Sequence, residues 1–348
     1  MSTVIKSPEL YDFTGRMEEI VLDSDVTISV ACKANGKLIL DEEYSPDANN
    51  LIRMRGLRNL CGLCLWGESL SYRGEQVHHG AQFSFTFGGG QTINRWLYLS
   101  NRWTKKAPSV CGPLTDCRRR ITYPGTTEIV SGFPWLKESV DENDDTSYHS
   151  YITYHVTTAD GRILSREELL NVDGSMEYAY TIETGVEELE QRFGVSGITQ
   201  FAIEFNGGKA EFLVCRDTVP RLINLRFRNL YDLPEMLHCT GDIQFEAANE
   251  SETNVVDGIS RKYGIKPKDS YKLLSGAMRL GEEFRLWRDL VNSNEVELYV
   301  EEYGWVPILI TKQKLQSDLH RQEFKEAEVT FEIADAHLAG LDHFFVRE

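Results

Sequence analysis

The chain has 348 residues, of which 41% are hydrophobic and 11% aromatic, so it is long enough for two or three folded domains. Its 37 basic and 54 acidic residues give a formal net charge of −17, which disfavours binding to nucleic acid because the phosphate backbone would repel it. No apolar run approaches the ~20 residues of a membrane-spanning helix, and the N-terminal residues lack a signal-peptide pattern, so we expect synthesis in a cytoplasm and no membrane insertion.

Alternating apolar and polar residues predict antiparallel strands through the first two-thirds of the chain. The first such run, residues 26–32, leads through an Asn35-Gly36 turn into a second strand, which is a typical hairpin signal. Further runs occupy residues 83–87, 148–156, 176–182 and 201–214. One face of each run is apolar and the other polar, as a half-buried antiparallel sheet requires.

Apolar residues at helical spacing predict a few short helices. These cover Leu57–Trp66, Arg166–Asn171, Val186–Phe193 and Glu282–Val291. The last is the most regular, because Phe284, Trp287 and Leu290 share one face and acidic residues occupy its first turn.

The last third of the chain is a strand-rich module. Its predicted strands are Ile223–Phe227, Val296–Val300, Pro307–Ile310 and Ala327–Ile333, the middle two joined across Tyr303-Gly304-Trp305. Because strands outnumber helices throughout, the predicted fold is mainly β, with antiparallel β-sandwich or barrel-like domains and a few short helices.

Polar, loop-like segments predict where the chain divides. They lie at residues 104–113 and 216–220. We therefore expect an N-terminal β domain at residues 1–105, a middle β-rich domain at 106–218, and a C-terminal β domain with one amphipathic helix at 219–348.

One cysteine pair has a spacing that could hold zinc or form a redox pair, but its surroundings favour buried structural thiols. Cys61 and Cys64 form a CxxC, with Cys111 and Cys117 as further candidate ligands, but the first pair lies in a predicted apolar helix and the second has the wrong spacing for zinc. An acidic run at residues 138–145 lacks the Gly and Glu of a calcium-binding EF-hand loop. We expect reduced thiols, no bound metal and no cofactor.

Catalytic motifs are also absent from the sequence. Gly88-Gly89-Gly90 is followed by a strand-like run rather than by the helix of a phosphate-binding loop, and neither GxSxG nor HExxH occurs. Adjacent His78 and His79 indicate an exposed turn. We therefore expect the protein not to be an enzyme.

Aromatic side chains offer one alternative function. Trp96, Trp103, Trp135 and Trp305 could stack on sugar rings, and Trp305 lies at a predicted hairpin tip. Since such tips also pack on sheets or on neighbouring subunits, a carbohydrate-binding adhesin module is the alternative hypothesis.

Several segments resemble a family of β-rich virion proteins, the tail or baseplate components of phages and prophages of Bacteroides-type bacteria. The resembling segments are Leu38–Asp47, Ile52–Leu60, Phe227–Glu235, Cys239–Gly241, Asp289–Val296 and Pro307–Thr311. In the turn that follows Asn229, the position of the family's usual glycine holds Asp232.

The resemblance implies a structural virion protein of a phage tail or baseplate, similar in role to distal tail proteins. Such a protein would be made in the bacterial host cytoplasm and would assemble into a homo-oligomer, expected to be a ring, and with other phage tail proteins. We expect the interfaces to use sheet edges and aromatic side chains. The expected interface residues are Asn229, Tyr231, Pro234, Glu235, Tyr303 and Trp305.

Overall fold

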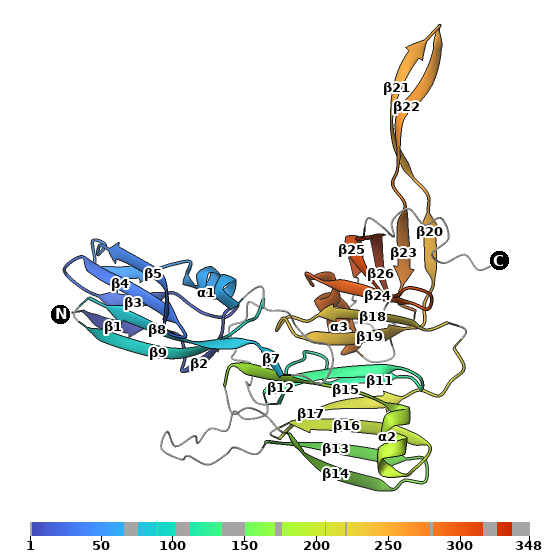
Figure 1. The fold of residues 1–348 in the computed structure, drawn as a ribbon, viewed down its shortest axis with the longest axis horizontal. Helices are drawn as coiled ribbons and strands as arrows, with labels where there is room; N and C mark the ends of the chain where they lie inside the picture. Colours follow the sequence, from blue (N-terminus) through green and yellow to red (C-terminus); the bar gives the residue numbers. More distant parts are fainter. Residues whose placement is uncertain are drawn as a thin grey trace.

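The computed structural model describes the chain except for residues 1, 66–75, 89, 102–111, 134–149, 171–175, 206, 220, 277, 279–280, 316–325 and 336–348. The described residues form β-sheets decorated by short helices, as the sequence predicts (Figure 1). No described helix is long and apolar enough to cross a membrane.

The described strands between residues 3 and 98, apart from β7 (Gln76–His78), form two sheets, called here the N-terminal sheets. One has the order β1 (Thr3–Lys6), β3 (Ile20–Asp23), β6 (Leu51–Met54). The other has the order β2 (Tyr11–Phe13), β9 (Gln91–Tyr98), β8 (Gly80–Phe87), β4 (Ile28–Ala34), β5 (Lys37–Tyr44). Helix α1 (Leu57–Leu65) packs on their shared core, to which the alternating Phe83, Phe85 and Phe87 contribute.

Two more sheets, called the middle sheets, face each other around a second core. The first has the order β10 (Gly112–Pro113), β12 (Thr127–Phe133), β15 (Tyr178–Gly185), β7 (Gln76–His78). The second has the order β11 (Arg119–Thr122), β17 (Gly208–Val214), β16 (Ile198–Phe205), β13 (Ser150–Thr158), β14 (Ile163–Leu170). Helix α2 (Val186–Phe193) contributes Val186 and Leu189 to this core.

The remaining strands form one seven-stranded sheet, called the C-terminal sheet, and a separate hairpin. The sheet has the order β19 (Pro234–Cys239), β18 (Ile223–Arg228), β24 (Val296–Val300), β25 (Gly304–Leu315), β26 (Ala327–Ile333), β23 (Ser270–Leu274), β20 (Ile243–Glu246). Helix α3 (Glu283–Val291) buries Leu286, Trp287 and Leu290 against it. The hairpin consists of β21 (Asn249–Val256) and β22 (Ile259–Pro267).

The predicted fold class is confirmed, with two local differences. Most strand pairs are antiparallel, but β2–β9 and β11–β17 run parallel. The helix predicted at Arg166–Asn171 is wrong, because residues 163–170 form β14 and pair with β13 along its length. This strand pairing outweighs the helical preference of the Arg-Glu-Glu-Leu-Leu segment.

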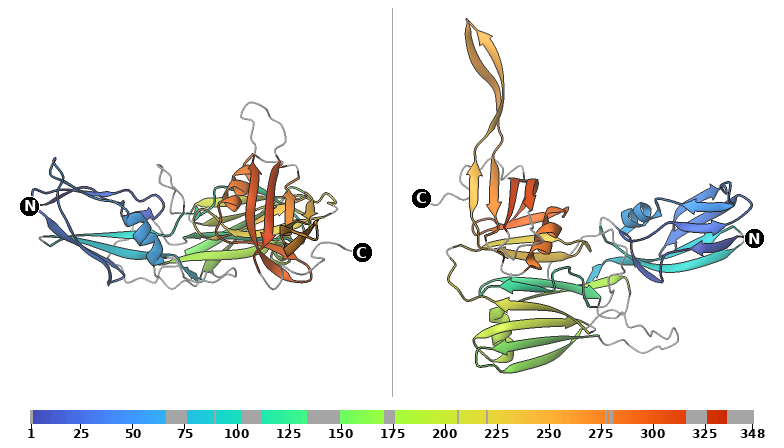
Figure 2. Two further views of the ribbon diagram at one scale, coloured as in Figure 1. Left: turned by 90° about the horizontal axis from the view of Figure 1, so that it is seen from above. Right: turned by 180° about the vertical axis from the view of Figure 1, so that it is seen from behind.

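The sheets lie side by side in Figures 1 and 2, the C-terminal sheet against the middle sheets and the N-terminal sheets to one side. Strand β7 comes from the first third of the chain yet pairs with β15 of the middle sheets. The division into domains at residues 1–105, 106–218 and 219–348 stays a prediction.

Candidate functional site: a projecting arm and a buried joint

The hairpin β21–β22, called here the arm and spanning Asn249–Pro267, projects away from the rest of the chain (Figures 1 and 2). It continues the hairpin of β20 and β23, since Asn249 pairs with Pro267 in the register that joins Glu246 to Ser270. Each of its strands has at least eight residues, so it extends by roughly 27 Å at the ~3.4 Å rise of an antiparallel strand. Asp257 and Gly258, with φ of 55° and 77°, form its tip.

Apolar side chains on the arm are open to solvent. Val255 is 62% exposed, and Ile259 and Ile265 are each 58% exposed. The arm packs on no core in the described part of the chain, and the outer edges of both its strands carry no strand partner there. Because an isolated two-stranded hairpin is marginally stable in water, this arrangement favours a partner that covers the arm.

A shared core lies at the junction of all three groups of sheets. Phe13 and Tyr98 come from the N-terminal sheets, Phe133 from the middle sheets, and Tyr231 from the C-terminal part of the chain. The ring centroids of Phe13 and Tyr231 are 5.3 Å apart, and those of Tyr98 and Phe133 are 4.4 Å apart. His79 is 1% exposed beside Phe133, so the prediction that it lies in an exposed turn is wrong.

The segment Asn229–Glu235 enters this junction through a tight turn. The Asn229 side-chain oxygen accepts hydrogen bonds from the backbone N–H groups of Tyr231 and Leu233, at 2.9 and 3.3 Å. Its side-chain nitrogen donates to the Leu114 carbonyl at 2.8 Å, which ties the turn to the middle sheets. Asp232 has a φ of 58°, in the left-handed region that glycine, asparagine and aspartate adopt more readily than other residues.

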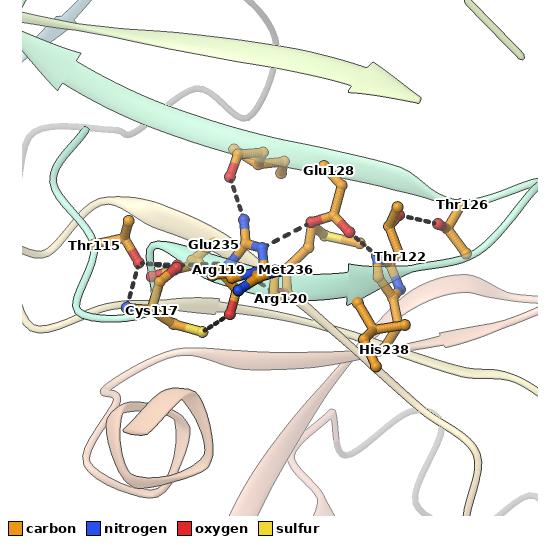
Figure 3. A network of polar contacts seen from close by, with 12 residues as sticks. Thr115, Cys117, Arg119, Arg120, Thr122, Thr126, Glu128, Glu235, Met236 and His238 are labelled. Carbon is orange, nitrogen blue, oxygen red and sulfur yellow. Dashed lines mark hydrogen bonds and ion pairs between the residues drawn. The ribbon is translucent and has the colours of Figure 1, made fainter. Parts of the chain in front are cut away.

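A buried guanidinium lies between the middle sheets and the C-terminal sheet (Figure 3). Arg120 on β11 is 4% exposed, and its Nε lies 3.1 Å from a carboxylate oxygen of Glu128 on β12. Its Nη1 lies 2.7 Å from Glu235 on β19. Nη2 donates to the Ile129 carbonyl at 3.2 Å, and the guanidinium carbon lies 4.9 Å from the Phe212 ring centroid. One cation on β11 therefore binds buried carboxylates of two other sheets.

His238 adds a second basic group to Glu128. Its Nε2 lies 3.3 Å from Glu128, and its Nδ1 lies 2.8 Å from the Asn224 side-chain oxygen. We call the set Arg120, Glu128, Asn229, Glu235 and His238 the joint. A cavity of about 30 Å³, room for roughly one water molecule, lies beside it.

The two carboxyl groups of the joint differ in pKa. Burial works to raise the pKa of Glu128, but the charges of Arg120 and His238 outweigh burial and hold it below its ordinary value. Burial raises the pKa of Glu235, and its attraction to Arg120 and hydrogen bonds offset only part of that rise. Glu235 is therefore the carboxyl group that protonates first as the pH falls.

The structure places the six expected interface residues in two different settings. Four of them, Asn229, Tyr231, Pro234 and Glu235, are buried within this chain. The other two lie where β24 turns into β25: Tyr303 is exposed and Trp305 is half-buried. The role of all six in contacts between subunits stays a prediction, but the four buried residues already bind parts of their own chain together.

Trp305 packs within its own sheet. The Arg226 guanidinium carbon lies 4.6 Å from a Trp305 ring centroid, and Tyr299 meets the indole edge-on at 5.3 Å. Trp96 is half-buried in β9, and Trp103 and Trp135 lie outside the described residues. Sugar stacking on Trp305 would therefore compete with Arg226 for the ring.

The candidate metal ligands are not gathered into a site within the described ranges. Cys61 is buried in α1, Cys64 is exposed on the same helix, and Cys117 is buried in the core of the C-terminal sheet. Cys111 lies outside the described residues. Among the residues described, no group of three or more His, Cys, Asp or Glu side chains could hold a metal ion.

The comparisons with known proteins yield only slight likenesses. No protein-family model and no curated protein matches the chain. The tail of an empty gene transfer agent (GTA) particle with C6 symmetry matches at 16% identity and a TM-score of 0.19, over 28% of this chain and 76% of its own. The virion of a native GTA particle matches at 15% identity and a TM-score of 0.19, over 28% of this chain and 78% of its own. Similarities with TM-scores this low do not support a conclusion about function.

Proposed function

We propose that the chain is a structural protein of a phage tail or baseplate, which assembles with copies of itself and with other tail proteins. The observation that carries the proposal is the arm, which exposes apolar side chains on both faces of a two-stranded sheet. The resemblance of the first and last thirds of the sequence to β-rich virion proteins supports the same conclusion.

The arm is built as an element that contacts something outside its own chain. Cross-strand partners Val256 and Ile259 lie on one face, and Val255 lies on the other. Burying such side chains contributes roughly 25 cal/mol per Å² of apolar surface, and free strand edges add backbone hydrogen bonds to any docked strand. An arm without a partner would have neither the buried apolar surface nor these additional backbone hydrogen bonds to stabilise it.

The rest of the chain gives the arm a rigid base. The shared core and the joint connect the C-terminal sheet to the middle and N-terminal sheets through aromatic contacts and buried ion pairs. A buried ion pair contributes little net stability, but it penalises any other docking of the two sheets. We propose that this rigidity sets the direction in which the arm reaches.

An arm that docks on a different surface of the next copy makes a heterologous interface. Repetition of such an interface gives a ring when the rotation closes. We propose a homo-oligomeric ring in the virion, built from chains made in the bacterial host cytoplasm, with no enzymatic activity and no cofactor.

The test is to remove the arm without disturbing the sheet beneath it. The Lys268 N–H donates to the Ala248 carbonyl at 2.8 Å, so an Asn-Gly turn can replace residues 249–267 and close the hairpin of β20 and β23. The natural chain should form oligomers in analytical ultracentrifugation and rings in electron micrographs, and the armless chain should stay monomeric with the same circular dichroism spectrum. Equal assembly of the two chains would refute the proposal.

The carbohydrate-binding alternative has its own test. If Trp305 formed a sugar platform, a glycan array would show specific binding that Trp305→Ala abolishes. Because Trp305 is already covered by Arg226, we expect no such binding.

A further inference from the structure

Among the described residues, one edge of the N-terminal sheets is an acidic strand that pairs with another strand on one side only. Strand β5 is the last strand of its five-stranded sheet, and it exposes Asp41, Glu42 and Glu43. Two such edges would repel each other, because acidic side chains would then lie directly opposite one another. The edge therefore discriminates against copies of itself and favours a basic strand.

The arm offers a basic strand with a free edge. The arm, residues 249–267, holds three acidic and three basic side chains, in a chain whose net charge is −17. The basic side chains all follow the tip, and Arg261 and Lys262 lie next to each other on exposed β22. The charged side chains of β22 are thus all basic, opposite in sign to the net charge of any second copy.

We propose that β22 of one copy adds to the β5 edge of the next copy as an antiparallel strand. The proposal rests on the proposed function and names the surface that receives the arm. One register matches five successive positions of the two strands, and it pairs Tyr44 with Ile259, Glu43 with Ser260, Glu42 with Arg261, Asp41 with Lys262 and Leu40 with Tyr263. This single register places two acidic side chains opposite two basic ones, and it places apolar or aromatic side chains opposite each other at both ends.

The backbone supports the same register. Within its own sheet, β5 pairs regularly from Tyr44 to Leu40, and its register then shifts. Within the arm, β22 pairs regularly from Ile259 to Tyr263, and its register then shifts as well. Regular strand geometry thus ends at the same cross-strand pair, Leu40 with Tyr263, in both partners.

The side chains of the two acid–base pairs lie on opposite faces of the extended sheet. Glu42 lies across from Val30 on the core face of β4–β5, whereas Asp41 lies across from Ala31 on the other face. Successive side chains of a strand alternate between faces, so Arg261 and Lys262 also separate in this way. A shift of the register by one residue would move every side chain to the wrong face.

The two strands belong to different copies. The arm and β5 lie at opposite ends of the chain in both Figures 1 and 2. An arm on one end and a receiving edge on the other make a head-to-tail contact, which uses one arm and one edge per copy and continues around a ring.

Charge reversal on each side tests the pairing. The arm variant combines Arg261→Glu with Lys262→Glu, and the edge variant combines Asp41→Lys with Glu42→Lys. Each alone should weaken self-association roughly tenfold or more in analytical ultracentrifugation, because two opposite-charge pairs become like-charge pairs. The control, Lys312→Glu with Lys314→Glu on exposed positions of β25, should assemble as the natural chain does.

Mixing the arm variant with the edge variant tests most directly whether these two surfaces pair. An equimolar mixture of the arm and edge variants should assemble, because the basic arm of the edge variant pairs with the acidic edge of the arm variant, and the acidic reversed arm pairs with the basic reversed edge. All four substitutions in one chain should restore assembly.

Two results would overturn the pairing. Assembly of the arm and edge variants at the strength of the natural chain would refute the pairing of β22 with β5. If the armless chain failed to assemble in the same experiment, the proposed function would still hold. Loss of binding to a double-stranded DNA fragment in the arm variant, with normal assembly of the edge variant, would identify nucleic acid as the partner of the arm instead.

Discussion

Replacing Arg120 with methionine removes the one guanidinium of the joint and keeps a long apolar side chain. Glu128 and Glu235, 0% and 2% exposed, then remain buried without that cation. Removing one partner of a buried ion pair costs about 3–5 kcal/mol of unfolding free energy. Because Glu128 keeps His238 and Glu235 keeps the Asn229 donor, we expect a value near the lower end, about 3 kcal/mol.

The loss of unfolding free energy caused by Arg120→Met should be smaller at low pH than at high pH. Without Arg120, the folded-state pKa of each buried carboxyl rises above its unfolded value, so the protonated form is the stable one. Such groups contribute stability that is present at low pH and is lost as the pH rises through the folded-state pKa. The Arg120→Met variant should therefore lose less stability at pH 5 than at pH 8.

Urea unfolding at the two pH values, followed by tryptophan fluorescence, measures this loss. The matched control is Arg162→Met, because Arg162 is 61% exposed in its ion pair with Asp160 and should change stability by less than about 1 kcal/mol. A loss below 1 kcal/mol for Arg120→Met, or an equal loss at both pH values, would show that the joint does not hold the sheets together.

Three further results are expected. Gly241→Ala should destabilise the C-terminal sheet by at least about 1–3 kcal/mol in the same urea assay, because its new methyl group would lie 1.8 Å from the Leu274 carbonyl oxygen, whereas Gly281→Ala meets no atom within 4 Å and should be neutral. Gly258→Val should disrupt the arm tip, whose φ of 77° disfavours a branched side chain, and should weaken assembly seen by ultracentrifugation while leaving the circular dichroism spectrum of the remaining sheets intact. Assembly should weaken in 1 M NaCl, where the screening length falls to about 3 Å, and salt-independent assembly would argue against paired charges at the arm.

Local sequence patterns were sufficient for most elements. The Asn35-Gly36 turn, with φ of 45° and 80°, joins β4 and β5 as its residue types predict. Helices α2 and α3 follow the predicted ranges to within one residue, since their apolar faces pack on cores that only a helical spacing can reach. The helix predicted at 166–171 failed because the partner strand β13 is invisible to local propensity.

The arm and the joint were missed for different reasons. The arm carries a readable signal, an Asp257-Gly258 turn between β-branched residues, but its exposed strands lack the regular alternation of a half-buried sheet. The joint carries no local signal at all. Arg120 and Glu235 are 115 residues apart in the sequence, and only the docking of two sheets brings them together.

The central claim is that the arm becomes covered when copies assemble, and hydrogen–deuterium exchange of its backbone amides tests this most directly. Spectra recorded at protein concentrations below and above the assembly threshold should show amides of residues 249–267 exchanging at least tenfold more slowly in the assembled protein, while the exposed edge of β14 stays unchanged. Arm amides that exchange at the same rate in monomer and assembly would contradict the account.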